Sequence, residues 1–447
     1  MTKTVTQARS HNYWRQVKGS ALFKGLAIAC SFLSIPLMIH YLGQEQFGVW
    51  STLLSVLSWI TFFDLGLGNG LRNKLAESLA KDLTDEAQRY VSSAYSLIGL
   101  ISLALFLILA IAAFAVPWQR VFNTQLLSTR ELSYAVLITG FFITLNFLVS
   151  LISCVLNAVQ KTAVVVLGQF LSNALSLILV YVLTKTTDAS LLYLATIYGI
   201  SMIGANVLLS VWFYKNNLHL IPRLSLDFSH VRPLLSLGLQ FFVIQIAVLV
   251  IFTTDKILIT QFFGPEYVTQ YDVVFKLFSI VTLIHGLITA PLWSSYTDAY
   301  HRGDNAWIKG MLRKQLALFL LVILAVGIMI PIAKPVIAIW IGHDLEVLMP
   351  LVFTMGIFVL VSTWNNIFGY ILGGINKIRL GSYYTVLTAA LNIPFSYFFA
   401  ITLRFGIAGI MLGTIASICI SAIISPLQVY YFIYTKQGNK ILSSFLK

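Results

Sequence analysis

Charged residues, cysteines and catalytic motifs are all scarce in this sequence. Only 10% of its 447 residues are Asp, Glu, Lys or Arg, whereas soluble domains carry roughly 25%. The sequence contains no P-loop, no Gly-x-Ser-x-Gly motif, no His/Cys metal spacing and no long polar connection with paired carboxylates. We therefore expect a membrane protein that is not an enzyme, does not hydrolyse ATP itself, and needs neither a metal nor a cofactor.

The three cysteines, Cys30, Cys154 and Cys419, lie in separate apolar segments. They are too few for a disulfide framework and form no metal-binding cluster, so we expect small buried side chains. The first 17 residues are polar and lead directly into a long apolar run. Since a secretory signal would have a short apolar region and a cleavage site, no cleaved signal peptide is expected.

Long apolar segments dominate what the sequence does contain. Hydrophobic residues make up 58% of the chain, and runs of about 20 residues, enough to cross a hydrocarbon core, recur along its length. Twelve segments are predicted to be membrane helices, near residues 18–42, 47–67, 90–116, 132–156, 162–183, 191–213, 233–263, 267–294, 312–333, 347–372, 380–402 and 407–434. The expected fold class is an all-α polytopic membrane protein with about twelve transmembrane helices.

Basic residues are distributed unevenly among the connections between these segments. The N-terminus and every second connection together carry 21 Lys and Arg. The intervening connections carry only 5, namely Arg120, Arg130, Lys185, Lys334 and Arg404. The positive-inside rule then places both termini in the cytoplasm. Topology thus explains most of the net charge of +13, and no nucleic-acid partner is expected.

The two halves of the chain resemble each other at an offset near 220 residues. The segment HYLGQEQFGVW (40–50) resembles QFFGPEYVTQY (261–271), and LNAVQK (156–161) matches LGGINK (372–377). Because six helices per half is an even number, both halves have the same orientation and form a parallel repeat, an arrangement typical of transporters.

This repeat predicts two six-helix lobes, related by a pseudo-two-fold axis and arranged around a central cavity. The N-terminal lobe is expected at residues 1–215 and the C-terminal lobe at 233–447. A cytoplasmic linker at 216–232 would join them.

Several ionisable residues are predicted at membrane depth, namely Lys24, Asp64, Asp255, Lys256, Asp272, Lys276 and His285. A charge at the centre of a membrane helix costs roughly 2.5–3.5 kcal/mol, so such residues are usually paired, face a water-filled cavity, or lie near an interface. Lys24 lies about 9 Å inside its segment at 1.5 Å per residue. It can therefore reach the cytoplasmic surface or serve as a ligand for an anion.

Four of these charges flank the predicted turn at Gly264-Pro265, at similar depth in two antiparallel helices. Asp255 and Lys256 precede the turn, while Asp272 and Lys276 follow it with the i,i+4 spacing of a helical pair. Two interpretations are open. The charges neutralise one another and hold the hairpin together, or one lysine binds an anion in a cavity with an aspartate as its releasable partner.

The repeat helps to weigh these interpretations. Subtracting 221 from the four positions gives uncharged residues in the N-terminal half, namely Ser34, Ile35, Ser51 and Ser55. The fold itself therefore does not require charges in this hairpin, which favours a functional role.

The stretch FFDLGLGNGLRN (62–73) ends the second apolar segment with a carboxylate, three glycines and an arginine. Asp64 and Arg72 would lie about 12 Å apart along a helix, too far for a direct pair. Because each glycine costs about 1 kcal/mol in a helix interior, a weak helix end is predicted. Gly66 and Gly70 also have the GxxxG spacing that permits close helix approach. We interpret the stretch as a cytoplasmic gate at which Arg72 meets an anion, with an interfacial cap as the alternative.

Two segments resemble a known family. YLGQEQFGVWSTLLSVLSWITFFDLGLGNGLRNKLAE (41–77) resembles the first hairpin of Wzx-type O-antigen flippases, which belong to the multidrug/oligosaccharidyl-lipid/polysaccharide exporter superfamily. TDKILITQFFGPEYVTQYDVVFKLFSIV (254–281) resembles the opening hairpin of their second half. Length, number of spans and the parallel repeat agree with this family across the whole chain.

The resemblance implies a function. The protein would flip an undecaprenyl-pyrophosphate-linked oligosaccharide, an O-antigen-type repeat unit, from the cytoplasmic to the periplasmic leaflet of the bacterial inner membrane by alternating access. A proton or sodium gradient would supply the energy. Membrane lipid, a polysaccharide polymerase and a chain-length regulator would be its partners. A multidrug or cation antiporter of the same superfamily is the alternative, and a membrane glycosyltransferase, polymerase or ligase is disfavoured by the short outward connections.

The resemblance also suggests roles for the charged residues. Lys24, Arg72, Lys256 and Lys276 would bind the pyrophosphate as positive charges. Asp64, Asp255 and Asp272 would take part in ion coupling or gating, because an aspartate that accepts a proton releases its lysine for the substrate.

Overall fold

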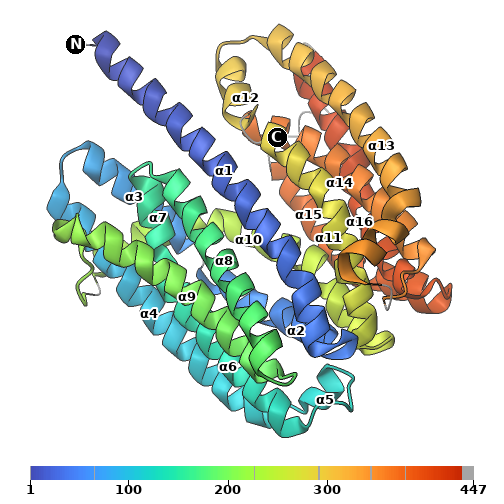
Figure 1. The fold of residues 1–447 in the computed structure, drawn as a ribbon. Coiled ribbons are helices and arrows are strands. Elements are labelled where there is room, and N and C mark those ends of the chain that lie inside the picture. Colours follow the sequence, from blue (N-terminus) through green and yellow to red (C-terminus); the bar gives the residue numbers. More distant parts are fainter. Residues whose placement is uncertain are drawn as a thin grey trace. The chain divides into compact units, whose positions relative to one another are not determined.

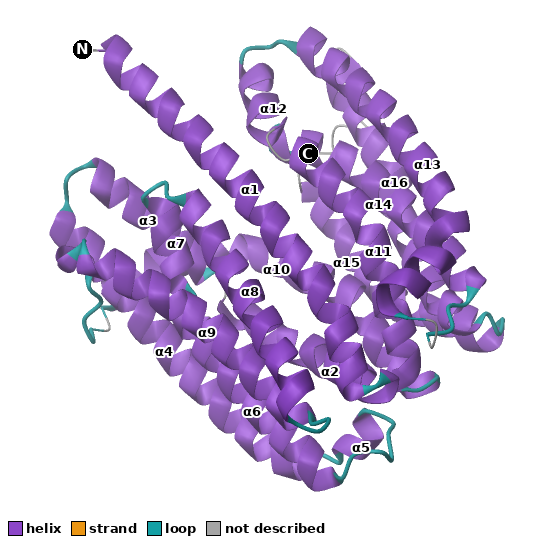
Figure 2. Cartoon of the chain, viewed as in Figure 1, coloured by secondary structure: helices purple, strands orange, loops and turns teal. Residues whose placement is uncertain are grey.

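The computed structural model describes residues 2–64, 66–225, 227–289, 292–342, 345–377 and 379–434, with the side chains at 2–18, 61–62, 64, 235–249 and a few single positions not described. Figure 2 shows helices joined by short loops, and this part of the chain contains no strand. The predicted class, an all-α polytopic membrane protein, is confirmed.

The chain divides into two compact units, Met1–Phe242 and Val243–Lys447. The first unit contains α1 (Thr2–Leu42), α2 (Gln44–Ser58), the 3-10 helix η1 (Trp59–Asp64), α3 (Leu67–Ala80), α4 (Thr84–Ala115), α5 (Trp118–Val121), α6 (Thr129–Val149), α7 (Leu151–Ala158), α8 (Thr162–Thr186), α9 (Leu191–Lys215) and the 3-10 turn η2 (Leu218–Leu220). Within it, α1 packs along α8, and α6 packs against α4 and α9 (Figure 1).

Helix α10 (Phe228–Phe262) begins in the first unit and ends in the second. The second unit continues with α11 (Pro265–Thr289), α12 (Leu292–His301), α13 (Asn305–Ile341), α14 (Met349–Gly374), α15 (Arg379–Tyr397), the π-helical segment η3 (Phe398–Thr402) and α16 (Gly406–Tyr434). Helix α14 is central to this unit, because it contacts α11, α12, α13 and α16. The lobes at 1–215 and 233–447 stay a prediction.

Ten helices in the described part of the chain are long and apolar enough to cross a membrane. They correspond to ten of the twelve predicted segments. The predicted segment 233–263 falls on α10, whose side chains at 235–249 lie outside the description. The predicted segment 47–67 is not one continuous α-helix, and this part of the prediction is wrong.

The interruption in that segment has a clear local cause. Helix α2 ends at Ser58 and a tighter 3-10 helix follows as far as Asp64. Gly66 then has a φ of 77°, in the left-handed region that only glycine adopts without a steric cost. The glycine pattern thus correctly predicted a break near Gly66, after which α3 begins at Leu67, although the α-helical part already ends at Ser58.

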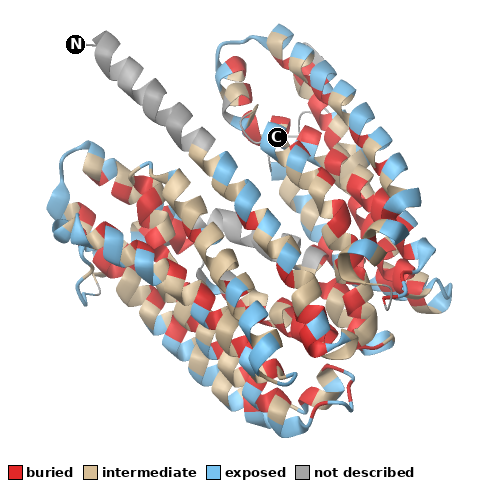
Figure 3. Cartoon of the chain, in the orientation of Figure 1, coloured by how far each residue is buried: buried red, intermediate tan, exposed pale blue. Residues whose placement is uncertain are grey.

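Exposed apolar side chains cover the outer faces of long helices. On α4 these include Leu100, Leu103, Leu107, Ile108, Ile111 and Phe114, and on α13 they include Leu320, Leu321, Leu324, Ile328 and Ile339. Figure 3 shows the corresponding exposed stripes on both helices. Contiguous apolar surfaces of this extent are rare on soluble monomers, so these faces are suited to lipid.

The internal repeat is visible in the local backbone. Three turns with positive φ occur at matching places in the two halves, namely Gly43 and Gly264 (78° and 115°), Asp82 and Gly303 (59° and 73°), and Gln160 and Asn376 (59° and 56°). Each matching turn thus places a residue with positive φ just after a helix, which supports a duplication.

The third pair of turns matches in its contacts as well. The backbone N–H groups of Lys161 and Lys377 each donate to the carbonyl five residues earlier, both at 2.8 Å. The Lys161 ammonium lies 4.9 Å from the ring centre of Trp212, and that of Lys377 lies 5.3 Å from the ring centre of Phe432. These cation–π contacts tie the same turn to the last helix of each half.

The segment before α10 packs firmly on the first unit. The backbone N–H of Arg223 donates to Ser92 Oγ at 3.0 Å. On α3, a Cβ added at Gly70 would lie 2.3 Å from the carbonyl oxygen of Leu234. The close approach predicted from the GxxxG spacing is therefore confirmed at Gly70, where the neighbour is the first turns of α10.

This contact generates a stability prediction. Gly70→Ala should lower the free energy of unfolding by about 1–3 kcal/mol, the usual range for overpacking, because the new methyl group collides with backbone. Thermal unfolding of the purified protein in detergent, followed by intrinsic fluorescence, measures the change.

Gly25→Ala in α1 is the matched control, since a Cβ at that position meets nothing within 4 Å. It should leave stability unchanged or raise it by up to about 1 kcal/mol through helix propensity. Equal unfolding temperatures for Gly70→Ala and the parent chain would show that α10 does not need this contact.

Candidate functional site

A buried carboxylate on α10 is the centre of a polar network inside the second unit. Asp255 is only 1% exposed. Its oxygens accept a hydrogen bond from the Tyr271 hydroxyl on α11 at 3.0 Å and from Thr414 Oγ1 on α16 at 2.9 and 3.1 Å. Among the described residues Asp255 makes no ion pair, so its negative charge is met only by neutral donors.

A second layer extends the network to α15. Asn392 Nδ2 donates to Thr414 Oγ1 at 3.0 Å, and Asn392 Oδ1 accepts from Thr254 Oγ1 at 3.1 Å. Helices α15 and α16 approach closely here, because a Cβ at Gly413 would lie 2.3 Å from the backbone of Ser396. Four helices therefore bring carboxylate, amide and hydroxyl groups together, and all of these side chains are buried.

An ion pair joins α10 to α11 beside this network. Lys256 Nζ lies 2.6 Å from Asp272 Oδ1, and both side chains are mostly buried. Lys276 is half-buried one turn further along α11. Because consecutive residues point about 100° apart on a helix, Asp255 and Lys256 contact different neighbours.

The structure therefore divides the four predicted hairpin charges. Lys256 and Asp272 pair across the hairpin, as the neutralising interpretation required. Asp255 does not join a common cluster and bonds instead to Tyr271 and Thr414. The helical rotation between neighbouring residues thus separates Asp255 from the Lys256–Asp272 pair.

Sequence reasoning missed most partners of Asp255. Asn392 is an amide inside a predicted span, which is a detectable signal. Thr254, Tyr271 and Thr414 carry none, because hydroxyl side chains are common in membrane helices, and those of Thr usually bond to their own backbone. Only the packing of α11, α15 and α16 against α10 identifies them.

In the first unit, Lys24 meets an amide instead of a carboxylate. Its ammonium donates to Gln169 Oε1 on α8 at 3.0 Å, and its side chain is half-exposed. One turn along the same interface, Asn173 Nδ2 donates to the carbonyl oxygen of Ala27 at 2.9 Å. Among the described residues, neutral amides thus link α1 to α8 at Lys24 and Ala27.

Arg72 lies on the exposed side of α3, whose opposite side is buried. The same helix carries Glu77, which pairs with Lys74 at 2.8 Å and Lys81 at 2.7 Å. Hydrogen bonds from these two lysines lower the pKa of Glu77 to about 2. The other charged residue of the predicted gate, Asp64, ends η1, and its side chain lies outside the described residues.

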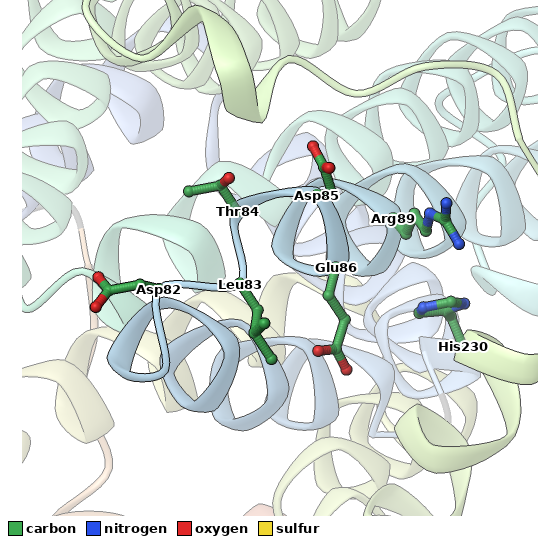
Figure 4. Close-up of a pocket in the computed structure, with 7 residues that line it drawn as sticks. All are labelled: Asp82, Leu83, Thr84, Asp85, Glu86, Arg89 and His230. Carbon is green, nitrogen blue, oxygen red and sulfur yellow. The ribbon is translucent and has the colours of Figure 1, made fainter.

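A polar pocket of about 360 Å³ lies between the α3–α4 turn and the start of α10 (Figure 4). The carboxylates of Asp82, Asp85 and Glu86 point in different directions, whereas Arg89 and His230 lie near each other. The acids do not converge on one point, so the pocket has no cation-binding geometry. Within the described residues no group of three His, Cys, Asp or Glu side chains could hold a metal ion.

Comparison with known sequences identifies relatives of this chain. Residues 17–297 match the model of the family described as "Polysaccharide biosynthesis protein". A protein of Salmonella typhimurium named "Putative O-antigen transporter" is 24% identical over 433 residues, covering 94% of this chain and 97% of that protein. The "Putative O-antigen export protein" of Yersinia pseudotuberculosis is 22% identical, with 89% and 90% covered.

Solved structures show the same fold at low sequence identity. The inward-facing conformation of a multidrug resistance MATE family transporter of the MOP superfamily has a TM-score of 0.74 at 15% identity, covering 92% of this chain and 94% of that one. The helical architecture is thus that of MOP superfamily transporters. Since the family model covers well over half of the residues, this multi-span membrane protein belongs to the polysaccharide biosynthesis protein family.

Proposed function

We propose that the protein flips an undecaprenyl-pyrophosphate-linked oligosaccharide from the cytoplasmic to the periplasmic leaflet by alternating access. It would act in the bacterial inner membrane with both termini in the cytoplasm, without catalysing a covalent reaction. The relatives named as O-antigen transport and export proteins support this substrate class. A polysaccharide polymerase and a chain-length regulator would receive the flipped repeat unit.

The observation that carries this proposal is the Lys256–Asp272 ion pair at membrane depth. A lysine held by a carboxylate in a low-dielectric region can exchange that partner for another anion of similar geometry. Pyrophosphate is such an anion, and the exchange would leave Asp272 to accept a proton. Lys276 lies one turn away and would supply a second positive charge.

Lys24 and Arg72 would bind the same headgroup from the first unit. Among the described residues, the hydrogen-bond partner of Lys24 is the neutral amide of Gln169, which leaves its charge to meet an anion. Arg72 is exposed on α3, where a guanidinium can meet an arriving pyrophosphate with two parallel hydrogen bonds. Asp64, at the end of the 3-10 segment, would act in gating.

Asp255 is the proposed ion-coupling residue. A buried carboxylate without a cationic partner is costly, and either a proton or a sodium ion bound among its oxygen neighbours removes that cost. Loading or unloading the site would change the hydrogen bonds from Tyr271 and Thr414. Since these residues lie on α11 and α16, ion binding would alter how three helices pack.

A multidrug or cation antiporter remains the weaker alternative. Its support is the fold of the MATE neighbours at 15% identity, which shows architecture alone. The lysines at membrane depth would repel a cationic drug.

The first functional prediction concerns the lysines. Lys256→Ala and Lys276→Ala should each abolish surface polysaccharide in cells that lack the chromosomal gene, because the pyrophosphate loses its counter-charge. Silver-stained gels of surface polysaccharide measure translocation, and immunoblots of the membrane fraction normalise it to protein amount. Lys185→Ala, at the exposed end of α8, is the control and should be neutral.

The double variant Lys256→Ala/Asp272→Ala separates a structural role from substrate binding. It removes both members of the pair, so neither is left buried without the other. We expect normal protein amounts but no surface polysaccharide. Restored translocation in the double variant would mean that the pair serves only to hold the hairpin.

The second functional prediction concerns coupling. Asp255→Asn keeps an oxygen acceptor for Tyr271 and Thr414 but removes the charge, so transport should no longer respond to an ion gradient. Proteoliposomes with a labelled lipid-linked oligosaccharide and an imposed proton or sodium gradient would measure this response. Asp298→Asn, at an exposed carboxylate on α12, is the matched control. A gradient response of Asp255→Asn equal to that of the parent chain would exclude Asp255 as the coupling site.

A further inference from the structure

The first unit contains a second pocket, separate from every charged residue discussed above. It has a volume of about 350 Å³ and lies among α2, α6 and α9. Its polar lining residues are Ser58, Asn146, Ser150 and Tyr198, and its apolar ones are Leu54, Ile143, Phe147 and Met202. None of the lining residues is charged, so the pocket suits a neutral polar ligand and not a pyrophosphate or a cation.

Two helix interruptions meet at this pocket. Ser58 is the last residue of α2 before the 3-10 segment, and Ser150 separates α6 from α7. Each serine hydroxyl donates to a carbonyl of the preceding turn, Ser58 to Ser55 at 2.6 Å and Ser150 to Phe147 at 3.1 Å. Irregular backbone at membrane depth is tolerated where it lines a hydrated cavity. In transporters, broken helices are also the best indicator of a binding site.

The depth of the pocket supports the same conclusion. Asn146 lies about 18 Å from the helix end at Ala158, and Met202 lies about 16 Å from the start of α9 at Leu191, at 1.5 Å per residue. Both positions are well inside helices that are long enough to span the membrane. Polar side chains at this depth usually face the protein interior or a hydrated cavity.

Neighbouring side chains hold the polar residues of the pocket in place, but some of their hydrogen-bonding groups have no partner among the described residues. Asn146 Oδ1 accepts from Asn206 Nδ2 at 2.8 Å, which orients the amide. The Tyr198 ring packs edge-on against Trp50, with ring centres 5.3 Å apart. Among the described residues, neither the Asn146 amide nitrogen nor the Tyr198 hydroxyl has a hydrogen-bond partner. Fixed donors beside an apolar wall are typical of small-ligand sites.

A pyranose ring matches this combination. It presents hydroxyls around its rim and C–H groups on its faces, so it needs neutral donors and acceptors at one edge and an apolar or aromatic wall at another. The volume is near the lower end of the roughly 300–1,000 Å³ typical of ligand pockets, which suits one sugar ring and not a whole repeat unit. A lipid chain would leave the amide and hydroxyl unpaired.

We propose that the pocket among α2, α6 and α9 is a monosaccharide subsite, with Asn146 and Tyr198 hydrogen-bonding one sugar of the translocated glycan. This inference rests on the proposed function, because it assigns part of that substrate to a specific place. The pyrophosphate would bind the cationic residues, whereas the sugar would be read by this uncharged pocket. Binding at Ser58 and Ser150 would also contact both helix interruptions directly.

The test compares two lipids on the full-length chain in nanodiscs. One is undecaprenyl pyrophosphate carrying the host's own repeat unit, and the other is undecaprenyl pyrophosphate without sugar. Tyr198→Phe removes one hydroxyl and keeps the ring against Trp50. It should weaken binding of the sugar-bearing lipid by about threefold to tenfold, the usual effect of one uncharged hydrogen bond, and leave the sugar-free lipid unaffected.

Two further variants keep the test decisive. Met202→Phe narrows the pocket and should likewise affect only the sugar-bearing lipid. Tyr193→Phe, at an exposed tyrosine on the same helix α9, should affect neither lipid. Equal affinities of the parent chain and Tyr198→Phe for the sugar-bearing lipid, or equal losses for both lipids, would overturn the subsite. Failure of the parent chain to bind either lipid would instead overturn the proposed function itself.

Discussion

A hydrocarbon layer offers no hydrogen bonds and little solvation of charge, and this constraint shapes both units of the protein. Every polar group at membrane depth must find a partner in the protein or in a hydrated cavity. Asp255 accepts hydrogen bonds from hydroxyl groups on two other helices, and Lys256 pairs with the carboxylate of Asp272. Each solution links α10 to a neighbouring helix, so these charges help to determine how α10, α11 and α16 pack.

The duplicated halves solve this problem differently. The two halves share left-handed turns and the same cation–π contact after their fourth span. In the first unit, however, Ser34 and Ser55, the equivalents of Asp255 and Lys276, donate to carbonyls of their own helices. Because these hydroxyls bond within their own helix, they do not fix the position of another helix. At equivalent positions, the second unit thus has charged side chains that link helices, whereas the first unit has serines that bond to their own helices.

The first unit compensates with interrupted helices. The breaks at Ser58–Gly66 and at Ser150 lie beside an uncharged pocket, whereas the deep charge pair and the buried carboxylate lie in the second unit. A substrate with an anionic headgroup and a neutral glycan contains both kinds of chemistry. Asymmetric specialisation of two similar units is a simple way to recognise such a molecule.

Much of this fold was predictable from local information. Apolar run length and turn residues identified ten helices that can span the membrane, because helix formation in lipid depends on composition more than on neighbours. The repeat was detectable from short matches such as LNAVQK and LGGINK, since the same turn requires the same residues. The helix break after Ser58 was only partly foreseen. Glycines marked its end at Gly66, but nothing in the residues before it signalled the 3-10 segment.

The sequence by itself determined the class of protein, its helices and the presence of rare charges at membrane depth, because each of these follows from side chains and their nearest neighbours along the chain. Tertiary structure alone decided which charges meet. It paired Lys256 with Asp272, turned Asp255 towards Thr414 and Tyr271, and brought Asn146 and Tyr198 to one pocket. The physical reason is that hydrogen bonds act over a few ångströms, whereas the residues that form them are separated by up to 159 positions in the chain.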